Sequence, residues 1–256
     1  MTPILVAVLA ASLLVFALAE AFFGWRERAP REHLATDAAY LASDFGLNFA
    51  VNGLRAAIPA GLAWAVGHAW RGPLWDRPIW VQLVLGGLVL EWAIWFAHWC
   101  WHRFDVLYPF HAVHHGSSHV YFLSGLRQHP VQFVGDQVFF ALLLVLGGVR
   151  PDAIVLLAIF QMVAAFFTHS NLDIRFGPLK YVLTSPRFHV IHHTASRETA
   201  MKNLGGGLSL FDWLFGTALD PDARPAPAEL GPGEPYPTTY RGQLVQPFRA
   251  LLGGGK

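Results

Sequence analysis

Long apolar segments constrain the fold of this chain more than any other feature of its sequence. The clearest are residues 3–23 (PILVAVLAASLLVFALAEAFF) and 78–100 (PIWVQLVLGGLVLEWAIWFAHWC). About 20 mostly apolar residues in an α-helix cross a hydrocarbon layer of about 30 Å. A helix also satisfies its own backbone hydrogen bonds where no water is available. Both segments therefore predict membrane-spanning helices.

The composition points to the same class of protein. Of the 256 residues, 54% are hydrophobic and 14% are charged, whereas a soluble domain has about 25% charged residues. The mean hydropathy is +0.39. A formal net charge of +1 offers no basic field for DNA or RNA, so no nucleic-acid partner is expected. The single cysteine, Cys100, excludes an internal disulfide framework and a cysteine-based metal cluster.

Three further segments are weaker candidates for membrane spans. Residues 132–149 and 152–170 are separated only by Arg150 and Pro151, which predicts a tight helical hairpin that need not cross the bilayer fully. The weakest candidate is 43–68, because polar residues interrupt it.

Those polar residues recur on one face of the expected helix. They are Asp44, Asn48, Asn52 and Arg55. Polar groups are costly in hydrocarbon, so this stripe should face protein and not lipid. Hydrogen bonding between helices is favoured over a direct catalytic role.

The distribution of Lys and Arg predicts the orientation in the membrane. Basic residues gather in an expected loop at 24–40, in residues 101–130 and beyond residue 170. The other side receives three arginines, Arg71, Arg77 and Arg150. Since positively charged loops stay in the cytoplasm, the histidine-rich region should be cytoplasmic. No basic residue precedes the first apolar run, so 3–23 is expected to be a retained span and not a cleaved signal peptide.

Histidines form three clusters in this apolar chain. One is an H-x-x-x-H pair, and two are copies of H-x-x-H-H, giving His98, His102, His111, His114, His115, His189, His192 and His193. Imidazoles three or four residues apart project from one helical face and can reach a common cation. Eight imidazoles exceed the three or four ligands of one tetrahedral zinc, so they predict two ions that share a site. Nitrogen donors suit iron, copper, nickel and zinc, so the donors alone do not name the metal.

Five segments resemble the sterol desaturase/fatty acid hydroxylase superfamily of membrane di-iron oxygenases. They are 91–102 (EWAIWFAHWCWH), 111–117 (HAVHHGS), 125–130 (GLRQHP), 185–194 (SPRFHVIHHT) and 211–217 (FDWLFGT). The resemblance implies an all-α fold, a multi-span membrane helical bundle with a cytosolic histidine-rich cap. It implies two iron ions held by the eight clustered histidines, with O2 as co-substrate. It also implies an external cytochrome- or ferredoxin-type donor, whose electrons serve to hydroxylate or desaturate a lipid C–H bond.

Two further histidines match positions that often supply ligands in the family. These are His129 in the RQHP segment and His169 in the HSN segment. A capping or supporting role is the alternative for each. His119 lies between the motifs and is expected not to be a ligand.

Three residues are candidates to orient the ligand imidazoles through hydrogen bonds. Glu91 stands where the family usually has Asp, and it is expected either to orient a ligand imidazole or to pair with Arg55. Asn203 lies in MKNLG, which replaces the family's usual Asp-x-Asn-Tyr-Gly. Asp212 follows Phe211 where the family has Trp-Asp. Whether Asn203 or Asp212 touches the metal shell is open at this stage.

We expect three regions along the chain. These are N-terminal transmembrane helices (1–84), a fatty acid hydroxylase-like di-iron catalytic region (85–218) and a Pro/Gly-rich C-terminal tail (219–256). The tail should be extended, and its last segment should lie on the membrane surface or cover the cap.

The predicted function is that of a membrane di-iron oxygenase acting on a lipid such as a fatty acyl chain or a sterol. Apolar side chains of 85–101 and 132–168 are expected to line the substrate path. The alternative is a histidine-rich membrane metal-binding or transport protein without oxygenase activity. Transporters place their ligands near the bilayer midplane, whereas these clusters lie at predicted helix ends and in loops, which favours the enzyme.

Overall fold

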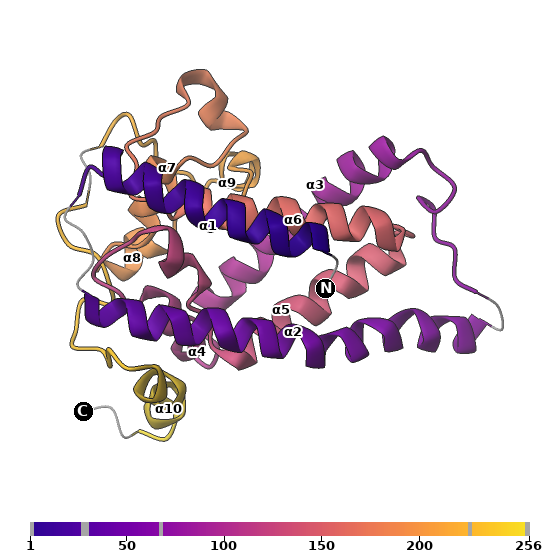
Figure 1. Cartoon of the computed structure of the whole chain (residues 1–256), viewed down its shortest axis with the longest axis horizontal. Helices are drawn as coiled ribbons and strands as arrows, with labels where there is room; N and C mark the ends of the chain where they lie inside the picture. The colour runs from indigo at the N-terminus through magenta and orange to yellow at the C-terminus, as the bar shows by residue number, and fades with distance from the viewer. Residues whose placement is uncertain (1–2, 27–30, 67–68, 225–226, 254–256) are drawn as a thin grey trace.

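The computed structural model describes residues 3–26, 31–66, 69–224 and 227–253 (Figure 1). Within these residues the chain forms α-helices and two short 3-10 helices, with two isolated β-bridges and no β-strand. This confirms the predicted all-α class.

Five long helices form the body of the molecule. They are α1 (Pro3–Phe23), α2 (Arg31–Val66), α3 (Ile79–Arg103), α5 (Pro130–Leu146) and α6 (Pro151–Thr168). Figure 1 shows α1, α2 and α6 along the length of the molecule. Helix α5 packs against α2 and α3, and α6 packs against α1 and α3. One apolar cluster joins α3, α5 and α6 through Leu90, Leu144 and Leu157.

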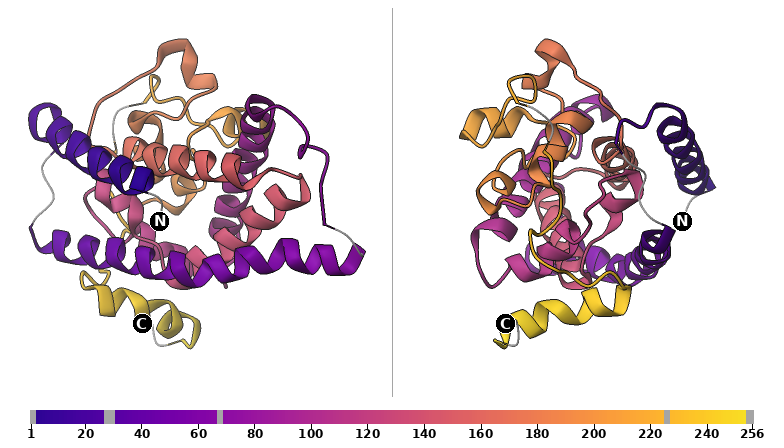
Figure 2. Two further views of the ribbon diagram at one scale, coloured as in Figure 1. Left: turned by 45° about the vertical axis from the view of Figure 1, so that its right-hand side comes forward. Right: turned by 90° about the vertical axis from the view of Figure 1, so that its left-hand side faces the viewer.

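Short helices gather at the end of the molecule where α3 finishes and α5 begins (Figures 1 and 2). They are α4 (Tyr108–His115), η1 (Phe122–Leu126), η2 (Gly177–Tyr181), α7 (Pro186–His192), α8 (Arg197–Ala200) and α9 (Leu210–Phe215). We call this end the cap. The last helix, α10 (Tyr240–Leu251), packs against α4 and α2. The tail therefore covers part of the cap, which is one of the two positions expected for it.

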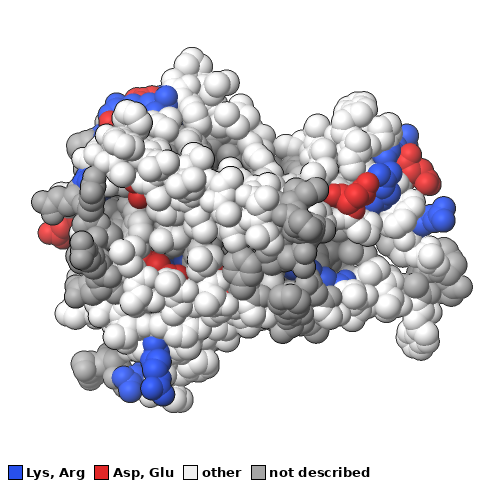
Figure 3. All heavy atoms as spheres, in the orientation of Figure 1, with Lys and Arg blue, Asp and Glu red and all other residues white. Residues whose placement is uncertain are grey.

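Three helices are long and apolar enough to cross a membrane, which makes the chain an integral membrane protein. They are Val6–Phe23, Ile79–Arg103 and Pro151–Thr168. Helix α5 is apolar but has 17 residues, or about 25 Å. All five predicted segments are thus helical, and among the described residues three have the character of spans. On the face shown in Figure 3 most charged side chains lie at the two ends of the molecule, and few are visible between them.

The predicted loop at 24–40 is wrong over its second half, because α2 begins at Arg31. Thr36, Asp37, Tyr40 and Asp44 are all buried and share one helical face. The Thr36 hydroxyl donates to the Thr238 carbonyl at 2.7 Å. Polar contacts with the cap, and not an apolar stripe, thus extend the helix, and hydrophobic patterning does not detect them.

The polar stripe of α2 faces protein, as predicted for Asp44, Asn48 and Arg55. Arg55 donates to the side-chain oxygens of Asn48, at 3.4 Å, and of Gln137 in α5. The side chain of Asn52 lies outside the described part of the structure. The stripe therefore joins α2 to α5.

A buried ion pair joins α2 to the cap. Asp37 and Arg127 are both fully buried, and the Arg127 guanidinium donates to both carboxylate oxygens of Asp37, at 3.1 Å for the longer contact. The Tyr121 hydroxyl donates to the same carboxylate. Removing one partner of such a pair leaves a buried charge without compensation, which costs about 3–5 kcal/mol.

Replacing Asp37 by Asn should therefore destabilise the protein strongly. At roughly 2–4 °C per kcal/mol for a chain of this size, the thermal unfolding midpoint in detergent should fall by roughly 6 °C or more. Asp152→Asn is the matched control, because the Arg150–Asp152 pair lies in the open, with the two side chains 34% and 57% exposed. Its midpoint should not change measurably. Equal shifts for the two variants would contradict the structural role of Asp37.

Candidate metal centre

Nine of the ten candidate histidines converge in the cap. His98 and His102 come from the end of α3, and α4 carries three more, His111, His114 and His115. His169 ends α6, and α7 carries His189 and His192, with His193 directly behind them. Residues more than 90 positions apart in the sequence thus meet in one small volume.

Local sequence explains how the two short helices present their histidines. Each helix has a proline in its first turn, Pro109 in α4 and Pro186 in α7, where a missing backbone N–H costs nothing. Ser185 caps α7 by accepting a hydrogen bond from the Phe188 N–H at 3.1 Å. Helical spacing then places the three imidazoles of each motif on adjoining faces.

The nine imidazoles form two groups. The first histidine group is His98, His102, His111, His115 and His192, and the second histidine group is His114, His169, His189 and His193. In each group one nitrogen per residue lies within 4.8 Å of all the others. The groups adjoin, since the rings of His115 and His193 have centroids 4.7 Å apart. The arrangement has room for two neighbouring cations.

Nitrogen spacing in both groups suits a shared metal ion. In the first group the Nε2 atoms of His98 and His111 are 3.0 Å apart, and those of His102 and His115 are 3.2 Å apart. In the second group the Nε2 atom of His169 lies 3.1 Å from that of His114 and 3.0 Å from that of His189. Two nitrogens bound to one ion at about 2.0–2.1 Å would be roughly 3.0–3.4 Å apart.

Hydrogen bonds on the outer side of the rings determine which nitrogen faces inward. The Nδ1 atoms of His98, His114 and His192 lie 2.7, 3.2 and 3.0 Å from the carbonyl oxygens of Leu204, Arg127 and Lys202, in that order. His111 and His169 have similar Nδ1 contacts, with Gln132 and Ala165. Because a carbonyl oxygen only accepts, Nδ1 carries the proton and the Nε2 lone pair points into the group. Lone pairs that face one another repel unless a cation lies between them, so the residues fit a pair of metal ions.

Burial keeps the cap imidazoles neutral, which is the metal-binding form. Loss of hydration lowers the pKa of His115 to about 3 and that of His169 to about 4. The same cause holds the pKa values of His111, His114 and His189 well below the ordinary range.

His129 lies outside both groups. Its Nδ1 accepts a hydrogen bond from the Val131 N–H at 3.1 Å, and so caps the start of α5. Its Nε2 lies 3.1 Å from the Leu244 carbonyl in α10. This is the capping alternative that the sequence left open, and we leave His129 out of the proposed ligand set below.

The side chains of the candidate supporting residues hold the loop between α8 and α9 (residues 201–209) through hydrogen bonds and make none to the imidazoles. Glu91 accepts hydrogen bonds from the N–H groups of Gly207 and Leu208, each at 3.0 Å, and from the side chain of Gln161 at 2.6 Å. The structure therefore places it on neither an imidazole nor Arg55. The reason is that the backbone of this loop passes directly over the carboxylate.

Asp212 and Asn203 hold the same loop. Asp212 accepts from the N–H groups of Leu204 and Gly205, at 2.8 and 2.7 Å. The Asn203 side chain donates to the Phe188 carbonyl in α7 at 2.8 Å, and its backbone is left-handed, with φ 57°. The loop carries the Leu204 carbonyl that contacts His98. Both residues thus position a ligand through the backbone.

Sequence reasoning missed a second positioning network, on α5. Gln132 contacts His111 at 3.1 Å through its carbonyl oxygen, and its amide donates to Asp136 at 3.3 Å. The Trp101 indole donates to the other oxygen of Asp136 at 2.7 Å. The signal in the sequence was the pair Gln132 and Asp136, two polar residues four positions apart in an otherwise apolar segment.

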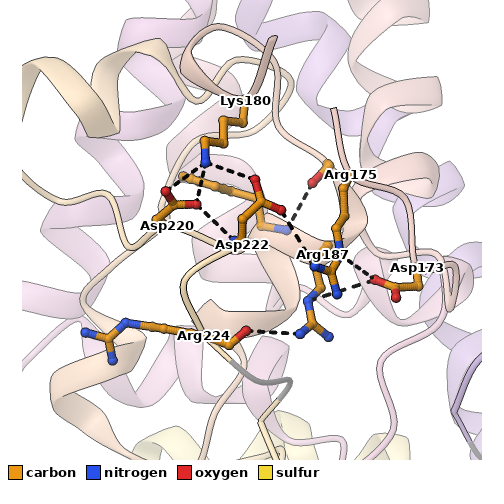
Figure 4. Close-up of polar contacts among 9 residues, drawn as sticks. Asp173, Arg175, Lys180, Arg187, Asp220, Asp222 and Arg224 are labelled. Carbon is orange, nitrogen blue, oxygen red and sulfur yellow. Dashed lines mark hydrogen bonds and ion pairs between the residues drawn. The ribbon is translucent and has the colours of Figure 1, made fainter. Parts of the chain in front are cut away.

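A network of ion pairs lies on the outer side of the cap (Figure 4). Lys180 contacts Asp220 at 2.7 Å and Asp222 at 2.9 Å. Arg187, two residues before His189, donates to the Arg224 carbonyl at 3.1 Å. These contacts tie the segment after residue 219 to η2 and α7.

The histidine groups open onto a large cavity in the helical body. Its volume is about 1450 Å³, and five histidines line one end of it: His98, His111, His114, His169 and His189. Apolar residues of α3, α5 and α6 form much of the wall, including Leu90, Phe140 and Val155. The cavity thus follows the two predicted segments, but α2 lines it as well, which was not expected.

Comparisons with known proteins agree with this architecture. The family model described as fatty acid hydroxylase matches residues 83–217. The chain is 30% identical over 171 residues to ornithine lipid hydroxylase OlsE of Rhizobium tropici, covering 67% of this chain and 51% of that protein. It is 27% identical over 144 residues to alkylglycerol monooxygenase of Homo sapiens, covering 56% of this chain and 31% of that protein.

The chain thus spans about half, or less, of the length of these curated relatives. No solved structure gives a significant match. The family is one of metal-dependent oxygenases, which agrees with the two histidine groups. The matched region contains every member of these groups and exceeds half of the sequence. The chain belongs to the fatty acid hydroxylase family.

Proposed function

We propose that this protein is a membrane di-iron oxygenase that uses O2 to hydroxylate a C–H bond of a lipid. The observation that carries the proposal is the meeting of two buried histidine groups with the end of a largely apolar cavity. A transport protein needs a polar path for its ion, whereas this cavity suits a hydrocarbon chain. The two relatives are a hydroxylase and a monooxygenase by name, which favours hydroxylation over desaturation.

The proposed ligands are the nine histidines of the two groups, and the proposed metal is iron. When bound, two irons would supply the redox chemistry that activates O2. In the overall reaction a C–H bond, O2, two electrons and two protons give an alcohol and water. The proposed source of the two electrons is an external cytochrome- or ferredoxin-type donor.

The residues of this chain position the reaction. Carbonyl groups and Gln132 fix the tautomer and ring orientation of five ligands. Apolar walls hold the lipid chain and exclude water from the site. The cap lies at the end of the molecule where α1 and α3 finish (Figure 1). Because basic residues gather in residues 24–40, 101–130 and beyond residue 170, we propose that the cap faces the cytoplasm.

Metal analysis tests the ligand set. Protein reconstituted with ferrous iron should bind about two irons per chain. His192→Ala removes a donor from the first group and His189→Ala one from the second, so each variant should lose about half of the iron or more. His119→Ala should keep the full amount. One zinc per chain in the wild type, or full iron in both cap variants, would contradict the proposal.

A variant of His129 separates a metal-ligand role from a helix-capping role. His129→Ala should keep both irons but lower the stability by about 1 kcal/mol, because the helix cap of α5 is lost. Iron content by mass spectrometry and thermal unfolding separate these effects. Loss of iron at unchanged stability would make His129 a ligand after all.

Lipid analysis tests the activity. Cells that express the protein should contain lipids with one added oxygen atom, labelled when 18O2 is supplied, and His189→Ala should abolish the label. Ala141→Phe should reduce the product about tenfold or more without loss of iron, because Ala141 lines the cavity. Its neighbour Leu142 is 38% exposed and is not among the lining residues, so Leu142→Phe should behave as wild type. Unlabelled lipids in iron-loaded, reductant-supplied samples would count against catalysis.

A further inference from the structure

The cavity has a polar patch that the metal centre does not use. Helix α2 contributes Asp44, Asn48 and Arg55 to the wall, and α5 contributes Gln137. Two charged side chains in a largely apolar cavity are costly unless something compensates them. The proposed chemistry at the histidines does not require them.

Asp44, which lines this cavity, has an unsatisfied side-chain oxygen. The residue is 9% exposed, and its Oδ1 atom has no hydrogen-bond partner. A buried carboxylate oxygen without a donor is rare in folded proteins, since it loses hydration without replacement. A ligand that brings a donor to this point would restore the lost hydrogen bond.

Arg55 brings a positive charge to the same polar stripe of α2. Its guanidinium reaches back along α2 to the Asn48 side-chain oxygen at 3.4 Å and across to Gln137. Asn48 lies one helical turn from Asp44, and its amide donates to the Asp44 backbone carbonyl at 2.9 Å. The guanidinium therefore lies beside Asn48, the residue one helical turn from Asp44.

The patch lies between the metal end of the cavity and its apolar remainder. Gln137 is five residues beyond Gln132, which contacts His111, so it is about 7.5 Å further along α5. Leu144, Val145 and Val149 line the cavity beyond it. A hydrocarbon chain fits that apolar part, and a polar group attached to the chain can reach the patch.

We propose that Asp44 and Arg55 form a subsite for the head of a zwitterionic aminolipid, an inference that rests on the proposed function. Asp44 accepts hydrogen bonds from the ammonium group, and Arg55 donates to the carboxylate. Opposite charges on the ligand match both side chains, and charge-assisted hydrogen bonds are about twice as strong as neutral ones. A neutral head such as glycerol would satisfy the hydrogen bonds but neither charge.

Three synthetic probes test the subsite on the wild-type, iron-loaded chain. N-palmitoyl-ornithine carries both charges, its methyl ester lacks the carboxylate, and N-palmitoyl-norvaline lacks the ammonium group. Dibrominated acyl chains would report binding by quenching tryptophan fluorescence, because Trp70, Trp75 and Trp101 line the cavity. The zwitterionic probe should bind about tenfold more tightly, or better, than either analogue. Equal affinities for the three probes would overturn the subsite without the need for any variant.

Variants assign each charge to its residue. Asp44→Asn should abolish the preference for the ammonium group and keep that for the carboxylate, whereas Arg55→Gln should do the reverse. Ser43→Ala is the matched control, since its hydroxyl only donates to the Tyr40 carbonyl on the same helix, and it should keep both preferences. If folded Asp44→Asn or Arg55→Gln protein keeps both preferences, the subsite is refuted.

The probes also separate this inference from the proposed function. Oxygenation of lipids without discrimination among the probes would refute the subsite and leave the oxygenase intact. Discrimination among the probes, without any oxygenated product from iron-loaded protein, would support the subsite and refute the oxygenase.

Discussion

The structure depends on nine imidazoles that converge with their ring nitrogens at about hydrogen-bond distance. The outer nitrogens of five rings contact oxygen acceptors, so the inner nitrogens of these five have no protons to share. Such an arrangement is unfavourable by itself, and the proposed cations would remove the conflict. The cap is therefore best understood as a shell that forces the donors together, and metal binding should contribute to its folding.

The residues that position the histidines are themselves held in place by residues from distant parts of the chain. Asp212 and Glu91 hold the loop that contacts His98, and the Arg127 carbonyl contacts His114. Arg127 in turn is paired with Asp37 on α2. A helix that contributes no ligand thus positions one through a single buried ion pair. This explains why α2 continues into the cap although its sequence there is polar.

The sequence predicted the helical class from its long apolar segments. It predicted the convergence of the three histidine clusters from the number of imidazoles and from the family resemblance of the motifs. It did not predict the contacts that orient the rings, since five of them end on backbone carbonyls or on Gln132, which no motif marks. His129 shows the limit most clearly. It matches a position that often supplies a ligand in the family, but the start of α5 directs its ring to Val131 and Leu244. The start of α2 was missed for a related reason, because contacts with Thr238 and Arg127 replace an apolar stripe.

The membrane explains why the cavity and the histidine groups meet where they do. A lipid substrate needs an apolar cavity, whereas a metal centre supplied with electrons needs a polar cap, so the two must meet at the end of the helical body. Helices α3, α5 and α6 provide this meeting point, because each has a cavity-lining face and an end that reaches the cap. Helix α2 adds the feature that apolar helices cannot supply, namely charge inside the cavity. A channel lined only by hydrocarbon would accept any acyl chain, and Asp44 and Arg55 make the interior selective for what the chain carries.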